Sequence, residues 1–413
     1  MQRNVGRRKR LPHVIAAARR LLSCGVVLGL GLGTYWAVRL AWADHLSRSQ
    51  DLTAREQGVR LFPAATLYGR LAEKREEWGG DPVPDLERAA ALEPENAEWR
   101  VRLGLRAELW GDLALAETSY LAAARLSRLY QPRYLLAQYY FRRQNADGFH
   151  AWSRAAFLTA YGDVTPLLDL CRRLEPDGEW LAGQAPGERP EIAAQILLFL
   201  AGHQPSGAAR GLALRLTAEA KPEHLPALLE YINRCVAEGD GESATRVWNA
   251  LCMRALLPER PLDPREGESL TNGNFQHAPS GMGFDWRMEK APWVRFAYSA
   301  AGLRVTLSGD QPESCLLASE FVPVAPGRRY RLRLSRLPAG TPSVDGLAWV
   351  VYDVSGKALA TAPGADGWLT FESPDGSRPI EILRLGLRYE RPLGATRLAG
   401  SFTIAGVQLE PAP

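Results

Sequence analysis

The chain has 413 residues, enough for two or three domains, and a formal net charge of +4 at pH 7. Seven basic residues precede the first apolar run and contribute +7, so the rest of the chain carries a net charge of −3. This near-neutral remainder shows no nucleic-acid-binding signature. The five cysteines form no Cys-x-x-C pair and no Cys/His cluster, which argues against zinc. Nearly all other basic residues are arginine, which together with many Ala, Gly and Leu residues indicates the coding bias of a GC-rich bacterium.

A basic segment precedes the first apolar run. About 18 uncharged residues extend from Leu21 to Val38, the lower limit for a helix that spans a bilayer. Because basic flanks stay in the cytoplasm, we predict a cytoplasmic segment over 1–20 and a transmembrane signal-anchor helix over 21–43. The protein is then a single-pass inner-membrane protein with its bulk in the periplasm. The seven basic residues are Arg3, Arg7, Arg8, Lys9, Arg10, Arg19 and Arg20.

Three other interpretations of the apolar run stay open. A cleaved signal peptide has the same layout, and Ala41-Trp42-Ala43 fits a small-x-small cleavage site, although the run is long for a signal peptide and Arg39 interrupts it. The stretch from Leu21 to Cys24 looks like a lipoprotein signal, but its cysteine opens the run instead of following it. A buried soluble helix is disfavoured by the one-sided basic flank. The first two interpretations also place the remaining chain outside the cytoplasm.

The apolar run carries Gly25, Gly29 and Gly33 at four-residue spacing. These residues lie on one face of a helix, where a second backbone can approach closely. The spacing predicts a helix–helix contact in the membrane, although glycine is also common in membrane helices for no specific reason.

Residues 44–257 are predicted to form an α-solenoid. Apolar positions recur every three or four residues, with Gly, Pro and Asp between the helices. One 34-residue register resembles the tetratricopeptide repeat, which has Leu-Gly in its first helix, Gly at the turn and a small-aromatic-small pattern in its second helix. The matching residues are Ala89, Pro94, Leu103, Gly104, Gly111, Ala116, Tyr120 and Ala123, and later Gly239, Ala244, Trp248 and Leu251.

In this pattern the small residues sit where helices cross and the aromatic fills the hole between neighbouring helix pairs. The fit degrades between the two matches, where Asn145 replaces the turn glycine. We therefore predict two good repeats, one fair repeat and several divergent helix pairs. The resemblance implies protein partners bound along the first helices. Candidate contacts there are Arg100, Arg102, Arg106 and Glu108, each of which also suits an ordinary solvated helix face.

The composition changes after residue 257. Pro258, Pro261 and Pro264 lie among charged residues and predict a linker over 258–268. From 269 to 413, short alternating runs such as Leu383–Tyr389 replace the helical pattern. Seven or eight such strands separated by Pro/Gly turns predict an antiparallel β-sandwich. The fold class is thus multidomain α and β.

The ends of this sandwich carry short motifs. It opens with Asn272-Gly273-Asn274-Phe275 and Gly283–Arg287, and it ends with Gly406–Leu409. These motifs resemble jelly-roll carbohydrate-binding modules, which bind glycans on aromatic platforms and sometimes hold a structural calcium, for which no site can be placed here. The resemblance implies candidate glycan contacts at Trp286, Trp293, Trp349, Trp368 and Tyr389, although core or rim packing accounts for each of them as well.

Two further side-chain sets follow from the same patterns. Arg331, Arg333, Arg384 and Arg388 alternate away from the core side and suit either an anionic-glycan face or a solvated one. Cys235 and Cys252 lie on consecutive predicted helices, where a disulfide or two buried free thiols are both compatible with the sequence.

The whole arrangement resembles uncharacterised bacterial membrane-anchored tetratricopeptide-repeat proteins encoded beside polysaccharide genes. The sequence has no Gly-x-Ser-x-Gly elbow, phosphate loop, His-Glu-x-x-His or dinucleotide fingerprint. We predict a non-catalytic scaffold without cofactors or metals that contacts envelope proteins, and a polysaccharide as a further candidate partner, in exopolysaccharide or envelope assembly. One alternative is a glycan-binding protein. Another is a sandwich hydrolase or lyase, for which Glu372, Asp375 and Glu381 are candidate acids.

Overall fold

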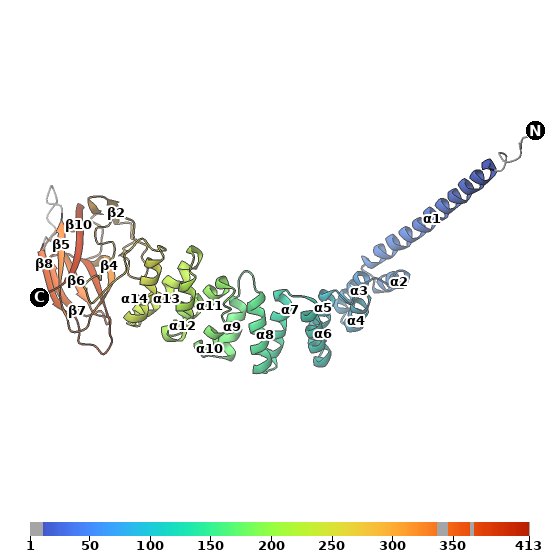
Figure 1. Ribbon diagram of the computed structural model, residues 1–413, viewed down its shortest axis with the longest axis horizontal. Coiled ribbons are helices and arrows are strands. Elements are labelled where there is room, and N and C mark those ends of the chain that lie inside the picture. Colours follow the sequence, from blue (N-terminus) through green and yellow to red (C-terminus); the bar gives the residue numbers. More distant parts are fainter. Residues whose placement is uncertain (1–10, 337–345, 364–366, 413) are drawn as a thin grey trace, which may run out of the picture. The chain divides into compact units, whose positions relative to one another are not determined.

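A computed structural model describes residues 11–336, 346–363 and 367–412 of the chain. Helices occupy the first part and strands the second, which confirms the predicted order of α and then β structure (Figure 1). The helices are α1 (Leu11–Ser47), α2 (Leu52–Leu61), α3 (Ala65–Glu77), α4 (Val83–Leu92), α5 (Ala97–Leu109), α6 (Leu113–Leu126), α7 (Tyr130–Arg142), α8 (Ala146–Thr159), α9 (Thr165–Leu174), α10 (Gly178–Gly183), α11 (Pro190–His203), α12 (Ser206–Ala218), the 3-10 helix η1 (Pro222–His224), α13 (Leu225–Ala237) and α14 (Gly241–Met253).

The strands form two five-stranded sheets in which all pairs are antiparallel. The first sheet has the order β1-β4-β9-β6-β7 and the second sheet the order β2-β3-β10-β5-β8. The strands are β1 (Arg287–Met288), β2 (Val294–Ser299), β3 (Gly302–Leu307), β4 (Ser314–Val324), β5 (Arg329–Arg336), β6 (Leu347–Tyr352), β7 (Ala358–Pro363), β8 (Gly367–Glu372), β9 (Glu381–Glu390) and β10 (Gly400–Pro411).

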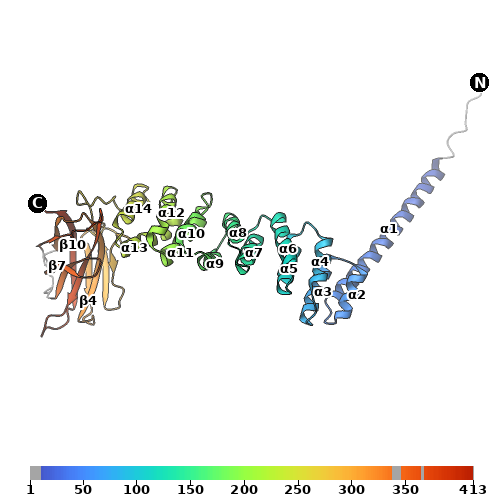
Figure 2. The same cartoon turned by 90° about the horizontal axis from the view of Figure 1, so that it is seen from below.

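The chain divides into two compact units, residues 1–152 and 153–413. The division falls inside α8, whereas the sequence suggested a boundary near residue 258. Helices α9–α14 therefore belong to the same unit as the two sheets. In both views of the chain, α13 and α14 are the helices that adjoin the sheets (Figures 1 and 2).

Local sequence explains where the helices begin and turn. Aspartate or asparagine side chains accept a backbone N–H at the start of several helices, which satisfies donors that a helix leaves unpaired. These N-cap residues are Asp51, Asn96, Asp112, Asp177 and Asp240. At the turn after α5, Gly111 has a φ of 89°, a conformation that a side chain would strain.

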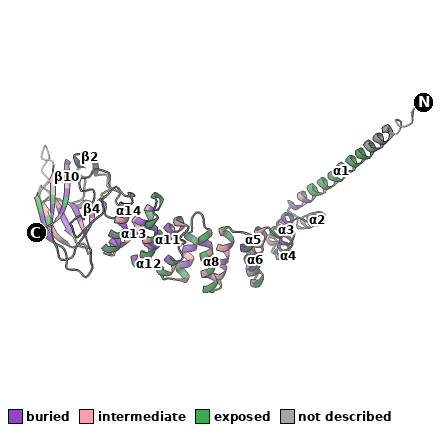
Figure 3. Cartoon of the chain, viewed as in Figure 1, coloured by how far each residue is buried: buried purple, intermediate pink, exposed green. Residues whose placement is uncertain are grey.

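In the first unit, α1 is one unbroken helix that contains the whole predicted apolar run. Its segment Arg19–Ser47 has a mean hydropathy of 1.7 and is long and apolar enough to cross a membrane, a criterion that a signal sequence or a soluble core helix also meets. The helix is exposed along most of its length (Figure 3). Of the predicted topology signals, Arg3, Arg7, Arg8, Lys9 and Arg10 lie outside the described residues.

The C-terminal end of α1 packs against the next two helices. Ala43 is fully buried in a cluster with Val59 of α2 and Leu67 and Leu71 of α3. Polar contacts reinforce this joint: Arg39 Nε donates to the Leu61 carbonyl at 2.7 Å, and Arg70 Nη1 lies 2.6 Å from Asp44 Oδ1. The apolar helix is thus continuous with the helical part of the unit.

In the second unit the two sheets share one apolar core. The alternation predicted for Leu383–Tyr389 is confirmed, because Leu383, Leu385, Leu387 and Tyr389 are all buried in it. The second sheet contributes its own inward rows, including Leu332 and Phe402. Each sheet therefore has one face toward the core and one outer face.

The segment predicted as a linker is bound on both sides. The backbone of Leu262 exchanges two hydrogen bonds of 2.7 Å with the side-chain amide of Asn249 on α14. Tyr330 of β5 donates its hydroxyl to the Pro264 carbonyl at 3.1 Å. Residues 258–268 therefore fix the last helix to the second sheet. The cysteines of this unit are free, and those at Cys235 and Cys252 are buried.

Candidate functional site

Among residues 11–336, 346–363 and 367–412, no group of three or more His, Cys, Asp or Glu side chains could hold a metal ion. The candidate sites in this part of the chain are helix faces, sheet faces and surface cavities.

The predicted repeat residues lie in the helix packing of the first unit. Ala89, Ala116, Ala123 and Tyr120 are completely buried, and Leu103 nearly so. Gly104 of α5 faces Tyr120 of α6, and a Cβ atom at Gly104 would lie 2.7 Å from the tyrosine ring. The glycine therefore makes room for the aromatic ring within the α5–α6 pair. Pro94 is exposed and lies two residues after the end of α4.

The second group of repeat residues lies at the end of the helices. Gly239, with a φ of 70°, makes the turn between α13 and α14, and Ala244 is fully buried. Trp248 is 1% exposed and meets Phe284, which belongs to the segment that leads into β1. Here the aromatic residue packs against the two-sheet region, residues 269–412, instead of a further helix pair.

Helices α3, α5 and α7 are joined by a ladder of ion pairs. Arg102 of α5 lies 2.5 Å from Glu73 of α3, and one turn later Arg106 lies 2.7 Å from Glu76. The ladder ends where both carboxylate oxygens of Glu108 accept from Arg142 of α7 at 2.7 Å. A cavity of about 140 Å³ lies between the first two of these pairs.

This ladder changes the interpretation of the predicted contact residues. Arg102, Arg106 and Glu108 bind neighbouring helices, so their charges are largely neutralised within the protein. The partners Glu73, Glu76 and Arg142 were not identified from the sequence. Each partner lies 29 to 34 residues from the charge with which it pairs. This spacing is close to the repeat length and could have identified the pairs from the sequence.

The glycine face of α1 is open. A Cβ atom at Gly25, Gly29 or Gly33 would meet nothing within 4 Å. Within residues 11–336, 346–363 and 367–412 nothing contacts this face, and the predicted helix–helix contact remains a prediction.

Three of the five predicted glycan contacts are wrong because their side chains lie in the core of the two-sheet region. Trp286 and Tyr389 are completely buried, and Trp349 is 2% exposed. Trp286 packs against Phe275 and Trp349, with ring centroids 5.0 and 6.0 Å apart. A ring enclosed on both faces cannot stack on a sugar. Trp293 is half-buried and packs against the same core.

Trp368 is the predicted contact that lies on a surface. It is 49% exposed on the outer face of β8 in the second sheet. The guanidinium carbons of Arg331 and Arg333, on the neighbouring strand β5, lie 4.6 and 5.6 Å from its ring centroid. Two of the four alternating arginines thus gather around one exposed indole.

The other two alternating arginines lie on the first sheet, whose outer face is partly covered. Arg384 and Arg287 both lie against the ring of Phe321, at 5.7 and 4.6 Å. Arg287 also donates to Asn233 of α13 at 2.9 Å. Burial, with a smaller contribution from Arg384, lowers the pKa of Arg287 to about 10. Arg388 pairs with Glu390 at 2.7 Å.

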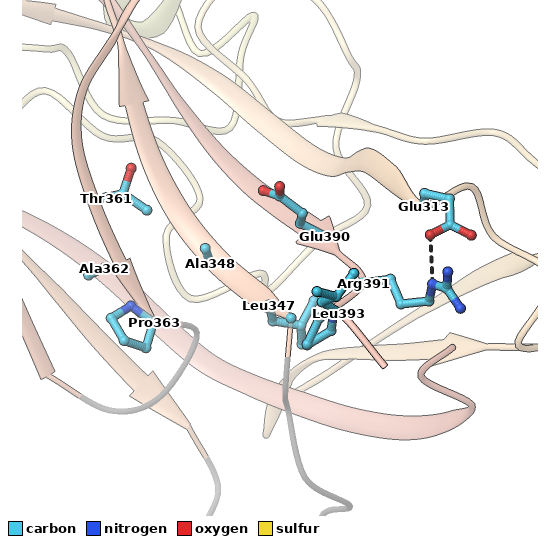
Figure 4. A pocket seen from close by; sticks show the side chains of 11 residues that line it. Glu313, Leu347, Ala348, Thr361, Ala362, Pro363, Glu390, Arg391 and Leu393 are labelled. Carbon is cyan, nitrogen blue, oxygen red and sulfur yellow. Dashed lines mark hydrogen bonds and ion pairs between the residues drawn. The ribbon is translucent and has the colours of Figure 1, made fainter. Parts of the chain in front are cut away.

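A cavity of about 650 Å³ opens at one end of β6, β7 and β9 (Figure 4). Leu347, Ala348 and Pro363 supply apolar walls, and the rim carries the 2.6 Å ion pair between Arg391 and Glu313. Arg397 also pairs with Glu313, at 3.1 Å. The charges at this rim therefore satisfy one another, and the cavity presents mainly small apolar side chains.

The comparisons with known proteins identify no family. No protein-family model and no curated protein matches the chain. Among solved structures, a chain of the "Crystal structure of accessory secretory protein 1,2 and 3 in Streptococcus pneumoniae" is similar to this one at 14% sequence identity and a TM-score of 0.23. That match covers 30% of this chain and 89% of the other. A likeness at this level carries no argument about fold or function.

Proposed function

We propose that the protein is a membrane-tethered scaffold that holds two recognition regions outside the cytoplasm. In this proposal α1 is an uncleaved inner-membrane anchor with its N-terminus inside. Helices α2–α14 act as a tetratricopeptide-like solenoid that contacts envelope proteins, and the two-sheet region acts as a β-sandwich recognition module. The process served is exopolysaccharide or envelope assembly.

The joint between α1 and the next two helices is the observation that carries the proposal. A cleaved signal peptide is expected to leave the folded domain intact, yet the candidate cleavage site Ala41–Ala43 lies within a continuous helix. Ala43 is fully buried against α2 and α3. Removing the helix here would expose Val59, Leu67 and Leu71 to water. An anchor that stays attached accounts for this packing.

A non-catalytic role is supported by the location of two groups whose pKa values are raised. Burial raises the pKa of Glu320 well above its ordinary value, but this side chain is enclosed in the two-sheet region and lines none of the cavities described above. Burial likewise raises the pKa of Cys171 to about 12, which disfavours its reactive thiolate. A reacting group needs both a tuned pKa and access to substrate.

The test uses the full-length protein in its membrane. Reporter cysteines at Ser49 and Gln408 are introduced one at a time into a Cys24→Ser/Cys315→Ser background, whose three remaining cysteines are buried. Each variant is treated with a membrane-impermeant maleimide in intact spheroplasts. The proposal expects both cysteines to react at the size of the uncleaved chain. Reaction at both positions only after lysis overturns the topology.

The scaffold role needs its own measurement. Cross-linking followed by affinity capture of the full-length protein is expected to recover envelope proteins, with loss of the capture when Arg100 is replaced by Glu. A matched control is Arg172→Glu on α9. Recovery of no envelope component, together with an unchanged glycan profile in a deletion strain, overturns the role in assembly.

A further inference from the structure

The outer face of the second sheet is polar, and its side chains are exposed or half-buried among the described residues. Strand register places Arg333 of β5 directly opposite Trp368 of β8 and Gln408 of β10. The next outward position on β5, Arg331, lies opposite Thr370 and Glu410. The intervening residues point inward, since Leu332 and Leu409 belong to the core. A single row of alternate residues thus crosses three strands on the solvent side.

This face is rich in arginine. Five arginines against two glutamates lie on it, and its other side chains are mostly hydroxyls and one amide. Arg331 pairs with Glu410 at 3.1 Å, while the other four arginines make no ion pair with any residue in the described ranges. The face comprises Arg295, Arg304, Arg329, Arg331, Arg333, Glu372, Glu410, Thr306, Thr370, Ser401, Thr403, Gln408 and Trp368.

The exposed indole has side-chain neighbours on this surface. Trp368 stands on a strand, with about half of its surface in water, and two guanidinium groups pack beside its ring. A ring held in this way loses little conformational freedom when a ligand packs on it. Arg333 meanwhile keeps its planar N–H fork free for a carboxylate.

We propose that this face binds an acidic polysaccharide, with Arg333 and Arg329 contacting carboxylates and Trp368 packing against a sugar ring. This inference deepens the proposed function, on which it rests for the location of the two-sheet region outside the cytoplasm. A hydrated polymer with repeated carboxylates matches a flat surface of arginines and hydroxyls. Binding through several exposed ion pairs weakens as salt rises.

Other occupants fit less well. A stable protein interface needs an apolar centre depleted of charged residues, whereas this face has one aromatic side chain among five arginines. A nucleic acid fits less well because the chain without its N-terminal basic residues carries a net negative charge. The outer face of the first sheet is not equivalent, because Arg287 and Arg384 are engaged with Phe321 there.

The binding test uses the full chain in zwitterionic nanodiscs and polygalacturonate as the probe. Biolayer interferometry compares this polymer with its carboxyl-reduced derivative and with poly-L-glutamate of matched length. We expect polygalacturonate to bind, with at least about tenfold weaker binding of the reduced polymer and of poly-L-glutamate. Raising the salt from about 0.05 to about 0.3 M should weaken binding further.

Matched variants locate the site. Trp368→Ala and Arg333→Gln are each expected to weaken binding at least about fivefold, and Arg333→Lys to restore it only in part, because lysine lacks the planar fork. The control Arg391→Gln lies at the cavity rim of the other sheet and should bind as wild type. The three substituted positions are exposed, so thermal unfolding of the four variants should not change.

Each of the other possible results contradicts a specific part of the inference. Absence of polygalacturonate binding at low salt, or binding that is insensitive to Trp368→Ala and Arg333→Gln, overturns the inference. Equal binding of poly-L-glutamate that is lost in the same variants makes the face an acidic-protein site and overturns the polysaccharide assignment. These results are independent of the topology and capture experiments, so failure of one proposal is distinguishable from failure of the other.

Discussion

The indole of Trp248 meets the ring of Phe284 edge-on, with centroids 5.7 Å apart and an interplanar angle of 86°. Trp248 belongs to α14 and Phe284 to the segment before β1, so the contact joins the helices to the two-sheet region. Gly283 lies beside it, and its N–H donates to the Asn233 side chain of α13 at 2.8 Å. Helix and sheet therefore share buried surface within one unit.

Phe284→Ala should uncouple these parts. The ring is completely buried, so its removal leaves a cavity between α14 and β1 and should lower the free energy of unfolding of this unit by about 3–5 kcal/mol. Denaturant unfolding followed by tryptophan fluorescence measures the change. Tyr161→Ala is the matched control, because this ring is 69% exposed and should change stability little. Equal effects of the two substitutions would contradict the packing described here.

Two glycine substitutions should have opposite signs. At Gly104 an added methyl group would collide with the Tyr120 ring at 2.7 Å, so Gly104→Ala should destabilise the first unit by about 1–3 kcal/mol. Gly211 lies within α12 with nothing within 4 Å of its Cβ position, so Gly211→Ala should stabilise by up to about 1 kcal/mol. Thermal unfolding of both variants provides the comparison, and a stabilising Gly104→Ala would refute the close packing.

Periodicity predicted which segments are helices and strands, because it depends on local burial. The inward row of β9 is an example, and so is the Gly104–Tyr120 pair. Strands β1, β2 and β7 were missed. Strand β1 has only two residues, and β7 is an edge strand of small residues, Ala358–Pro363, with no strong alternation. The tightly bound segment 258–268 was missed because its prolines and charges have the composition of a linker.

Which aromatic residues face outward could not be predicted from composition. Trp286 and Trp368 are both tryptophans near strands, yet one is buried between the sheets and the other is half-exposed. The difference depends on which alternate row faces the partner sheet, a tertiary property. The same limit applies to the ion-pair ladder, since pairing of Glu73 with Arg102 requires the spacing of successive helices to be known.

The mature protein should retain its N-terminal helix. Ala43 is buried against α2 and α3, so the candidate cleavage site lies in a packed helix. We expect a signal peptidase not to cleave there, because the site would first have to unfold into an extended conformation. Intact-mass measurement of the membrane-extracted protein should therefore give the full chain. Ala41→Leu removes the small residue that cleavage would require, and it should leave the mass otherwise unchanged. A wild-type chain shorter by about 43 residues, restored to full length by Ala41→Leu, would show cleavage.

Glu320 should make the stability of the two-sheet region depend on pH. Its Oε1 accepts from the Thr271 N–H and hydroxyl at 2.8 and 3.1 Å, while its Oε2 has no hydrogen-bond partner in the part of the chain that the structure describes. Burial raises its pKa well above the ordinary value of 4.5, and the nearby carboxyl groups of Asp285 and Glu259 raise it further.

The folded state therefore keeps a proton on Glu320 that the unfolded chain releases above about pH 4.5. The stabilising effect of this proton is complete below that pH and is lost as the pH rises through the folded-state pKa. Glu320→Gln, which is neutral at every pH, should be more stable than wild type at pH 7, and the difference should close near pH 4. Chemical unfolding at both pH values measures this difference. The exposed Glu219→Gln should show no such convergence, and a Glu320→Gln variant that is less stable than wild type at pH 7 would mean that the folded protein holds this carboxyl group ionised.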